Sequence, residues 1–254
     1  MSDYGLQRIG VIRSPYKEKF AVPRQPGLVP DGTGELHLSA PYNHPDAVRG
    51  LDAFSHIWLL FIFHQTMEQG WHPTVRPPRL GGNSRVGVFA TRSTFRPNAI
   101  GMSLVALQAV HIRKNEVILE LGSLDLVDGT PVVDIKPYLP YAESIATARA
   151  GFAQHSPVAE MAVFFSAQAA VRLDVLAPSY PHLRRFITDV LAQDPRPAYR
   201  RQQNDDQIYA ALLLEFNVKW RVTANQAEVL VIEDAVAGMT FSPSPPLAAR
   251  QDPA

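Results

Sequence analysis

The sequence of 254 residues contains no cysteine, which excludes disulfide bridges, thiolate metal sites and cysteine nucleophiles. It also has no long hydrophobic run. The longest, residues 57–63, is far shorter than the ~20 residues that a membrane-spanning helix needs. The first ten residues have no apolar stretch after a basic start. We therefore expect no signal peptide, no membrane partner and a cytoplasmic location.

Several short motifs of nucleotide-binding and metal enzymes are missing as well. No GxGxxG fingerprint follows a strand, no phosphate loop ends in Gly-Lys-Ser/Thr, and neither HExxH nor GxSxG occurs. The eight histidines are scattered. His56 and His64 would share a face of one strand, but no carboxylate stands at ligand spacing, which favours one buried and one rim histidine over a metal pair. We expect no metal site.

Acidic residues are missing from a long central segment, although the net charge of the whole chain is zero. No Asp or Glu occurs between Gln69 and Asn115. Within this segment, residues 76–101 hold five arginines, three prolines, four glycines and no lysine, and we call them the Arg block. Arginine pairs bidentately with phosphate and carboxylate, whereas a solvated surface would use lysine equally well. We interpret the Arg block as loops that bind an anion, with a solvated surface as the alternative.

The first half of the chain has the pattern of a mainly β protein. Period-two alternation or continuous apolar runs, separated by Gly and Pro, predict a series of short strands. They fall at residues 9–11, 35–38, 57–63, 86–89, 104–112, 117–121 and 132–135. Residues 57–63 are continuously apolar, so we expect that strand to be buried on both faces. Many short strands without helical periodicity favour a β-barrel or a sandwich.

The second half has a different pattern. Residues 142–156 are rich in Ala and Ser and are interpreted as a linker. Tyr180, Leu183, Ile187, Val190 and Leu191 recur at helical spacing before Asp194-Pro195, and residues 211–222 and 229–232 are predicted strands. We predict an N-terminal β-barrel domain over residues 1–145, a small α+β C-terminal domain over 157–236 and a disordered tail over 242–254.

Two polar clusters interrupt the apolar pattern before the Arg block. Pro23, Arg24 and Gln25 form a prolyl loop with one cation and one amide. His64 and Gln65 follow the most apolar predicted strand. Polar residues at a strand end can face a pocket or merely meet solvent, and the spacing leaves both alternatives open.

A further polar cluster follows residue 124. Asp128-Gly129 is a standard turn pair, so turn formation alone would explain Asp128. Asp134 and Lys136 would share one face of a strand, where they could form a weak salt bridge. A carboxylate near the Arg block could instead orient a hydroxyl or amino group, and spacing does not decide between these alternatives.

Together these clusters resemble the TsaA-like family of TrmO tRNA methyltransferases. The matching strings are IGVIRSPYKEKFAVPRQPGLV, LDAFSHIWLLFIFHQTMEQGW, RPPRLGGNSRVGVFATRSTFRPNAIG and LGSLDLVDGTPVVDIKPYLPYAES, and QDPRPAYR and FNVKWRV extend the resemblance to the C-terminal part. One position departs, because Ala99 stands where members usually have proline. The resemblance implies a homodimeric β-barrel enzyme that uses S-adenosyl-L-methionine. It also implies that N6 of threonylcarbamoyladenosine, beside the tRNA anticodon, is methylated.

The resemblance implies cofactor contacts for individual residues, and the chemistry of the modified base and of tRNA predicts further roles. The expected cofactor-binding residues are Pro23, Arg24, Gln25, His64, Gln65, Arg92, Met102, Asp128, Gly129, Thr130 and Pro131. The expected substrate-binding residues are Arg76, Arg79, Arg96, Asn98, Lys136 and Tyr138, with arginine pairs clamping the threonine carboxylate of the modified base. Arginines of the C-terminal part, Arg184, Arg185, Arg196, Arg200 and Arg201, are expected to contact phosphates in the anticodon region.

Because the acceptor nitrogen is a weak nucleophile, a general base would accelerate methyl transfer. Asp134 and His64 are the candidate bases, from their predicted strand positions. The alternatives are a methyltransferase for another substrate and a non-catalytic barrel that binds RNA or a nucleotide. A hydrolase that uses His64 or His56 is disfavoured, since no nucleophile is paired with either histidine.

Overall fold

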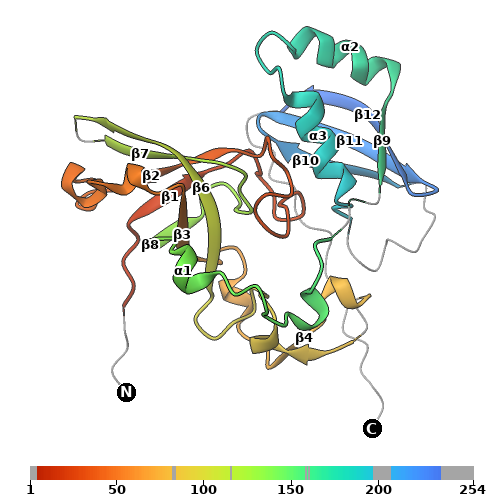
Figure 1. Ribbon diagram of the computed structural model, residues 1–254. Coiled ribbons are helices and arrows are strands. Elements are labelled where there is room, and N and C mark those ends of the chain that lie inside the picture. Colours follow the sequence, from red (N-terminus) through yellow and green to blue (C-terminus); the bar gives the residue numbers. More distant parts are fainter. Residues whose placement is uncertain are drawn as a thin grey trace.

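A closed β-barrel forms the N-terminal part of the molecule (Figure 1). The computed structural model describes residues 5–81, 84–114, 116–157, 159, 161–196 and 207–235. Within these residues, antiparallel strands close in the order β1-β2-β7-β6-β3-β8. Their bounds are β1 Gly10–Arg13, β2 Gly34–Leu38, β3 His56–Ile62, β6 Ile100–Arg113, β7 Glu116–Leu121 and β8 Pro131–Pro137. The predicted β-barrel is confirmed.

The barrel core takes alternate residues of its strands, most regularly in β3 and β7. In β3, Ile57, Leu59 and Phe61 are buried, whereas the residues between them are only partly buried. The prediction that this strand is buried on both faces is therefore wrong. Alternate side chains of a barrel strand point outward, and the outer face of β3 is only partly covered.

The Arg block does not contribute the predicted strand 86–89 to the barrel, and that prediction is wrong. β5 (Val86–Gly87) is only two residues long and pairs with β4 (Thr74–Val75) in a separate sheet. The chain then turns into a 3-10 helix at Val88–Ala90. Most of the block is therefore loop. Other short helices are Pro45–Val48, Leu51–Ala53, Met67–Gln69, Pro78–Leu80, Gly151–Ala153 and α1, Pro140–Glu143.

The C-terminal part is a sheet covered by two helices, which confirms the predicted small α+β part (Figure 1). The strand order is β10-β11-β12-β9, with β9 parallel to β12. The bounds are β9 Ala162–Phe165, β10 Ile208–Leu213, β11 Phe216–Thr223, β12 Gln226–Asp234, α2 Ala167–Leu176 and α3 Leu183–Ala192.

The predicted helix before Asp194 is confirmed as α3, whose apolar stripe is buried. The predicted single strand 211–222 is wrong, because β10 and β11 form a hairpin that turns at Leu214, with φ of 54°. α2 and β9 were not predicted. The connecting residues 142–156 are exposed throughout. The predicted tail 242–254 lies outside the described residues.

The loop between β1 and β2 joins the barrel to the C-terminal part. The Leu214 amide donates to the Pro15 carbonyl over 2.7 Å, and the ring of Tyr16 lies 5.7 Å from that of Phe186. Arg185 pairs with Asp31 at 3.3 Å. This loop continues into Pro23–Gln25, so the C-terminal part supports one of the polar clusters identified in the sequence. Among the described residues, no helix is long and apolar enough to cross a membrane.

Candidate functional site

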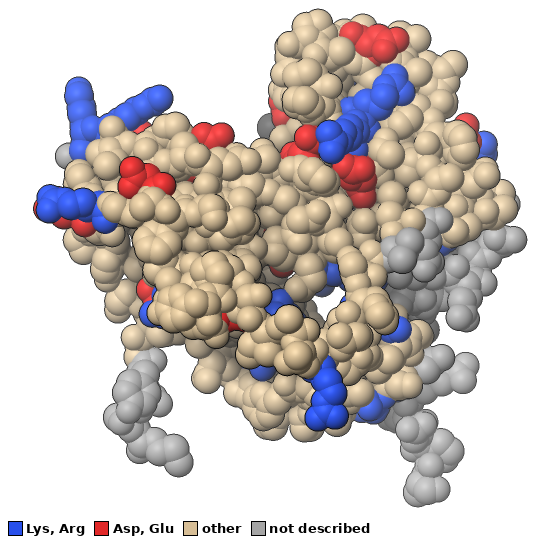
Figure 2. Space-filling model, viewed as in Figure 1, with Lys and Arg blue, Asp and Glu red and all other residues tan. Residues whose placement is uncertain are grey.

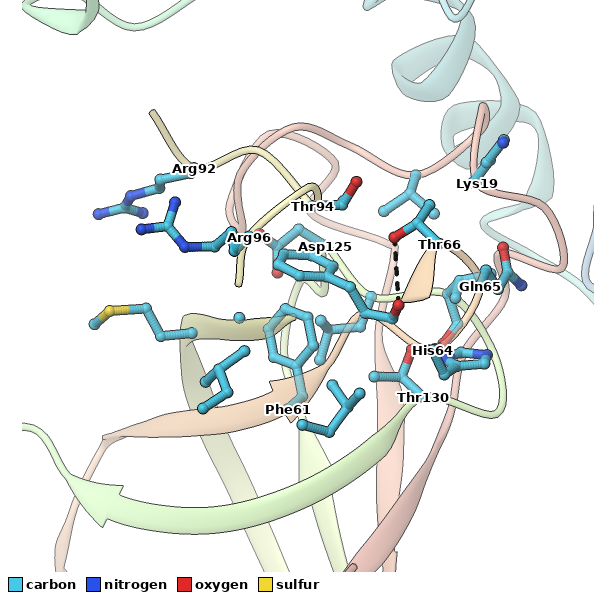
Figure 3. A pocket seen from close by; sticks show the side chains of 18 of the residues that line it. Lys19, Phe61, His64, Gln65, Thr66, Arg92, Thr94, Arg96, Asp125 and Thr130 are labelled. Carbon is cyan, nitrogen blue, oxygen red and sulfur yellow. Dashed lines mark hydrogen bonds between the residues drawn. The ribbon is translucent and has the colours of Figure 1, made fainter. Parts of the chain in front are cut away.

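A pocket of about 680 Å³ lies at one end of the barrel (Figure 3). It is formed where β3 ends, where β6 begins and where the chain turns toward β8, and it is completed by the β1–β2 loop and the Arg block. Four segments far apart in the sequence therefore meet in one concave site. Predicted site residues that line it are Pro23, Arg24, Gln25, His64, Gln65, Arg92, Arg96, Met102 and Thr130.

The pocket walls are largely apolar and aromatic. Phe20, Phe61, Phe63 and Phe95 contribute to them, and the Phe61 and Phe63 rings pack edge to face with centroids 5.0 Å apart. Gly101 faces the Phe61 ring so closely that an added Cβ would lie 2.3 Å from its Cζ atom. A glycine is therefore required at this position to hold the ring where it is. Such walls suit the flat apolar part of a ligand.

Cations surround these walls. Figure 3 shows Arg92 and Arg96 on one side of the pocket and Lys19 on the other. The Arg92 Nη1 atom donates to Gln25 Oε1 over 2.7 Å, which links the Arg block to the β1–β2 loop. Over the face seen in Figure 2, acidic and basic side chains are largely interspersed. Lys19, Arg24, Arg92 and Arg96 make the described lining of the pocket predominantly basic.

The arginines of the block have different environments. Arg96 donates to the Thr91 carbonyl over 2.8 Å and the Val88 carbonyl over 3.3 Å, so it folds the block onto itself. Arg79 donates to the carbonyl of His155 in the connecting segment. Arg76 and Arg79 do not line the pocket, and neither does the exposed Asn98.

The turn before β8 has a structural part and a pocket-facing part. The Ser14 amide donates to Asp128 Oδ1 over 2.8 Å, and Lys17 Nζ lies 3.0 Å from Asp128 Oδ2. Gly129 adopts φ of 79°. Asp128, Gly129 and Pro131 do not line the pocket, whereas Thr130 does. Asp128 therefore ties the turn to the start of the β1–β2 loop.

The predicted residues Asp134 and Lys136 of β8, and Tyr138 just after it, do not line the pocket. Asp134 and Lys136 form a salt bridge at 3.1 Å, with side chains 47% and 63% exposed. Neither residue lines the pocket, and the Tyr138 ring packs against Trp58 at 6.3 Å. The two candidate bases are thus separated, since only His64 lines the pocket, where burial lowers its pKa.

Asp125 is a pocket residue that the sequence analysis missed. It is the only acidic residue among the described residues that line the pocket. It accepts a hydrogen bond from Ser103 Oγ over 2.5 Å, and burial raises its pKa to about 6, against the opposing effects of Ser103 and Arg92. The available signal was its position between Leu124 and Leu126, both buried.

The C-terminal arginines also differ from one another. Arg184 lies over the Phe165 ring at 5.0 Å, and Arg185 pairs with Asp31. Arg196 is buried and forms a bidentate pair with Asp194. Arg200 and Arg201 lie outside the described residues. Within the described residues, no cluster of three or more metal-ligating side chains is present.

The fold and the site define a β-barrel protein with a ligand pocket that combines aromatic walls and arginines. Two family models match the chain: the tRNA-methyltransferase O N-terminal domain over residues 11–144 and the TrmO C-terminal domain over residues 158–235. The chain therefore belongs to the TrmO family.

Individual relatives cover most of the chain. An Escherichia coli protein named tRNA (adenine(37)-N6)-methyltransferase is 66% identical over 233 residues, which are 92% of this chain and 99% of the relative. A Pseudomonas aeruginosa protein, named putative S-adenosylmethionine-dependent methyltransferase RcsF, is 45% identical over 85% of this chain and 92% of its own length. The crystal structure of TrmO from Pseudomonas aeruginosa matches with a TM-score of 0.74 and 37% identity, covering 91% of this chain and 99% of that one.

Proposed function

We propose that this protein transfers a methyl group from S-adenosyl-L-methionine to N6 of adenine 37 in tRNA, where the base carries a threonylcarbamoyl group. The observation that carries the proposal is the convergence of the polar clusters on one pocket, in a chain 66% identical to an enzyme named for this reaction. We further propose that it works in the cytoplasm as a homodimer. Met102 lines the pocket and is 49% exposed, and an apolar side chain exposed there supports a protomer contact.

The pocket fits S-adenosyl-L-methionine by its size and by the chemistry of its lining. Its volume lies within the 300–1,000 Å³ or so that is usual for ligand sites. Aromatic walls suit the adenosyl group, and the guanidinium of Arg92 suits a carboxylate. When bound, the cofactor supplies an electrophilic methyl group on a sulfonium. We assign its binding to Pro23, Arg24, Gln25, His64, Gln65, Arg92, Met102 and Thr130, with Asp128, Gly129 and Pro131 shaping the turn behind Thr130.

The main catalytic contribution of the chain is positioning. Alignment of the two reacting groups supplies a large part of the rate of a displacement reaction. The Gln25–Arg92 hydrogen bond holds two pocket walls together, and phenylalanines line the space between them. Arg96, which is anchored by two carbonyls, is the arginine best placed to pair with the threonine carboxylate.

The remaining predicted substrate residues lie outside the pocket. We propose that Arg76, Arg79, Asn98, Lys136 and Tyr138 contact the anticodon loop around the modified base. The bases of an unpaired loop can be splayed apart and stacked on arginine or aromatic planes. Arg184 and Arg185 are proposed to contact phosphates further along the tRNA, with a salt-dependent effect on affinity.

A methyl-transfer assay on two tRNAs tests this function. Purified protein and labelled S-adenosyl-L-methionine are incubated with tRNA that carries or lacks the threonylcarbamoyl group, and the nucleosides are analysed by mass spectrometry. We expect one methyl group on N6 of the modified adenosine and none on plain adenosine. Cofactor binding without transfer to either tRNA would favour a binding module, and methylation of another nucleoside would favour a different substrate.

A further inference from the structure

Among the described residues, the pocket is lined by a single carboxylate and several cations. Asp125 lies between Arg92 and Arg96 on one side and His64 on the other (Figure 3). Among the described residues Asp125 forms no salt bridge of the kind that ties Asp128 to Lys17, and its side-chain partner is a neutral hydroxyl.

The position of the Asp125 carboxylate is fixed from two directions. Ser103, on the inner face of β6, is 1% exposed and donates its hydroxyl to Asp125 Oδ1 over 2.5 Å. On either side along the chain, Leu124 and Leu126 are anchored in the barrel core. The side chain is therefore held at the pocket by packing and by a hydrogen bond, which is the arrangement that a reacting group needs.

The surroundings of Asp125 make it a stronger base than a free carboxylate. Burial raises its pKa to about 6, while the Ser103 hydrogen bond and the Arg92 charge act in the opposite direction. Burial, with a smaller contribution from the charge of Asp125, also raises the pKa of Tyr16 in the β1–β2 loop. At neutral pH Asp125 is therefore ionised, yet it binds a proton more readily than a solvated aspartate does.

Resting on the proposed function, we propose that Asp125 is the general base that removes the N6 proton of the acceptor adenine during methyl transfer. The electron pair of the N6–H bond stays on nitrogen as the new N–C bond forms. The pair of the breaking C–S bond leaves with sulfur, and the proton moves to a carboxylate oxygen of Asp125 and then to solvent. This assignment replaces Asp134, whose carboxylate is paired with Lys136 outside the pocket.

The test compares Asp125→Asn with Ser103→Ala in the full-length protein. Asn keeps the shape and can still accept the Ser103 hydrogen bond, but it cannot take a proton. Ser103→Ala keeps the base and removes a hydrogen bond that lowers its pKa. The matched control is Asp52→Asn, an exposed aspartate that precedes β3 at the end of that strand away from the pocket. Single-turnover methylation is followed from pH 5 to 8, and cofactor affinity is measured by calorimetry.

We expect the wild-type rate to fall as the pH drops through about 6, because the protonated carboxyl group cannot act as a base. Asp125→Asn should lower the rate by roughly 10²–10⁴-fold and abolish this acid limb, with cofactor Kd within about threefold of wild type, a change worth less than ~1 kcal/mol. Ser103→Ala should move the acid limb to higher pH. Asp52→Asn should match the wild type in rate, pH profile and affinity.

Two outcomes would overturn the assignment while leaving the proposed function intact. One is an Asp125→Asn enzyme with wild-type rate and acid limb, and the other is a loss of cofactor affinity large enough to account for the lost rate. The same assays on His64→Gln and Asp134→Asn identify a rival base. If one of these residues is the base, only its variant would lose the fall of the rate at acid pH. A wild-type protein that methylates neither tRNA would refute the proposed function itself, and with it the role of Asp125.

Discussion

Replacing Gly101 with alanine tests whether the pocket wall is packed as tightly as the structure shows. Gly101 stands in β6 opposite Phe61 of β3, and the two residues are paired in the sheet. An added Cβ would lie 2.3, 2.5 and 2.9 Å from three atoms of the Phe61 ring. Real Cβ atoms do not approach so closely, so the ring must move. Phe61 is 5% exposed and packs against Phe63, which leaves it little room to do so.

The expected cost follows from overpacking a close-packed core. Inserting a methyl group into such a site costs about 1–3 kcal/mol. In a protein of this size each kcal/mol lowers Tm by about 2–4 °C. We therefore expect Gly101→Ala to unfold at a clearly lower temperature and lower urea concentration than wild type. Because the displaced ring borders the pocket, cofactor affinity should fall as well.

A double-mutant cycle separates this clash from other effects of a glycine replacement. Phe61→Leu removes the ring, so the added methyl group should cost much less in that background. Gly87→Ala is the matched control, because Gly87 also lies in a β-strand, the short β5 outside the barrel, and a Cβ there would have no atom within 4 Å. A Gly101→Ala protein within about 0.5 kcal/mol of wild type, the usual range for a surface substitution, would refute the packing described for Phe61. Equal costs of the alanine in both backgrounds would refute it too.

Three further predictions concern the charged residues. Arg92→Lys keeps the charge but loses the planar guanidinium, so cofactor affinity measured by calorimetry should weaken by roughly tenfold. Arg113→Lys, at an exposed position at the far end of β6, should leave this affinity unchanged. Asp125→Asn should raise Tm at pH 7 but not near pH 4. Because burial raises the folded-state pKa of Asp125 to about 6, the wild type loses stability as the pH rises from about 4 through 6, and the uncharged Asn does not. An equal Tm change at both pH values would contradict this. Asp128→Ala should destabilise the protein by about 1–3 kcal/mol in urea unfolding, because it leaves the Ser14 amide without its partner, and a change no larger than that of Asp52→Ala would show that the turn does not depend on Asp128.

The sequence by itself determined the class of fold and the segments of the site. Alternation and Gly/Pro punctuation are local properties, so they predicted the barrel strands, and helical spacing predicted α3. The Arg block and the prolyl loop were identified because their composition is unsuited to a core. The same local signals were insufficient for residues 208–223. There an apolar run hides a reversal at Leu214 that depends on backbone φ rather than on hydrophobicity.

Only the tertiary structure decided which members of each segment face the pocket. Asp125 and Asp134 are both aspartates beside apolar residues, yet one borders the pocket with Ser103 and the other pairs with Lys136 on the outside. Arg92 and Arg79 occur in one basic block, but they bind to different neighbours. The physical reason is that side-chain direction in a closed barrel depends on strand register and on where each loop returns. Both are set by contacts between residues far apart in the chain, such as Gly101 with Phe61.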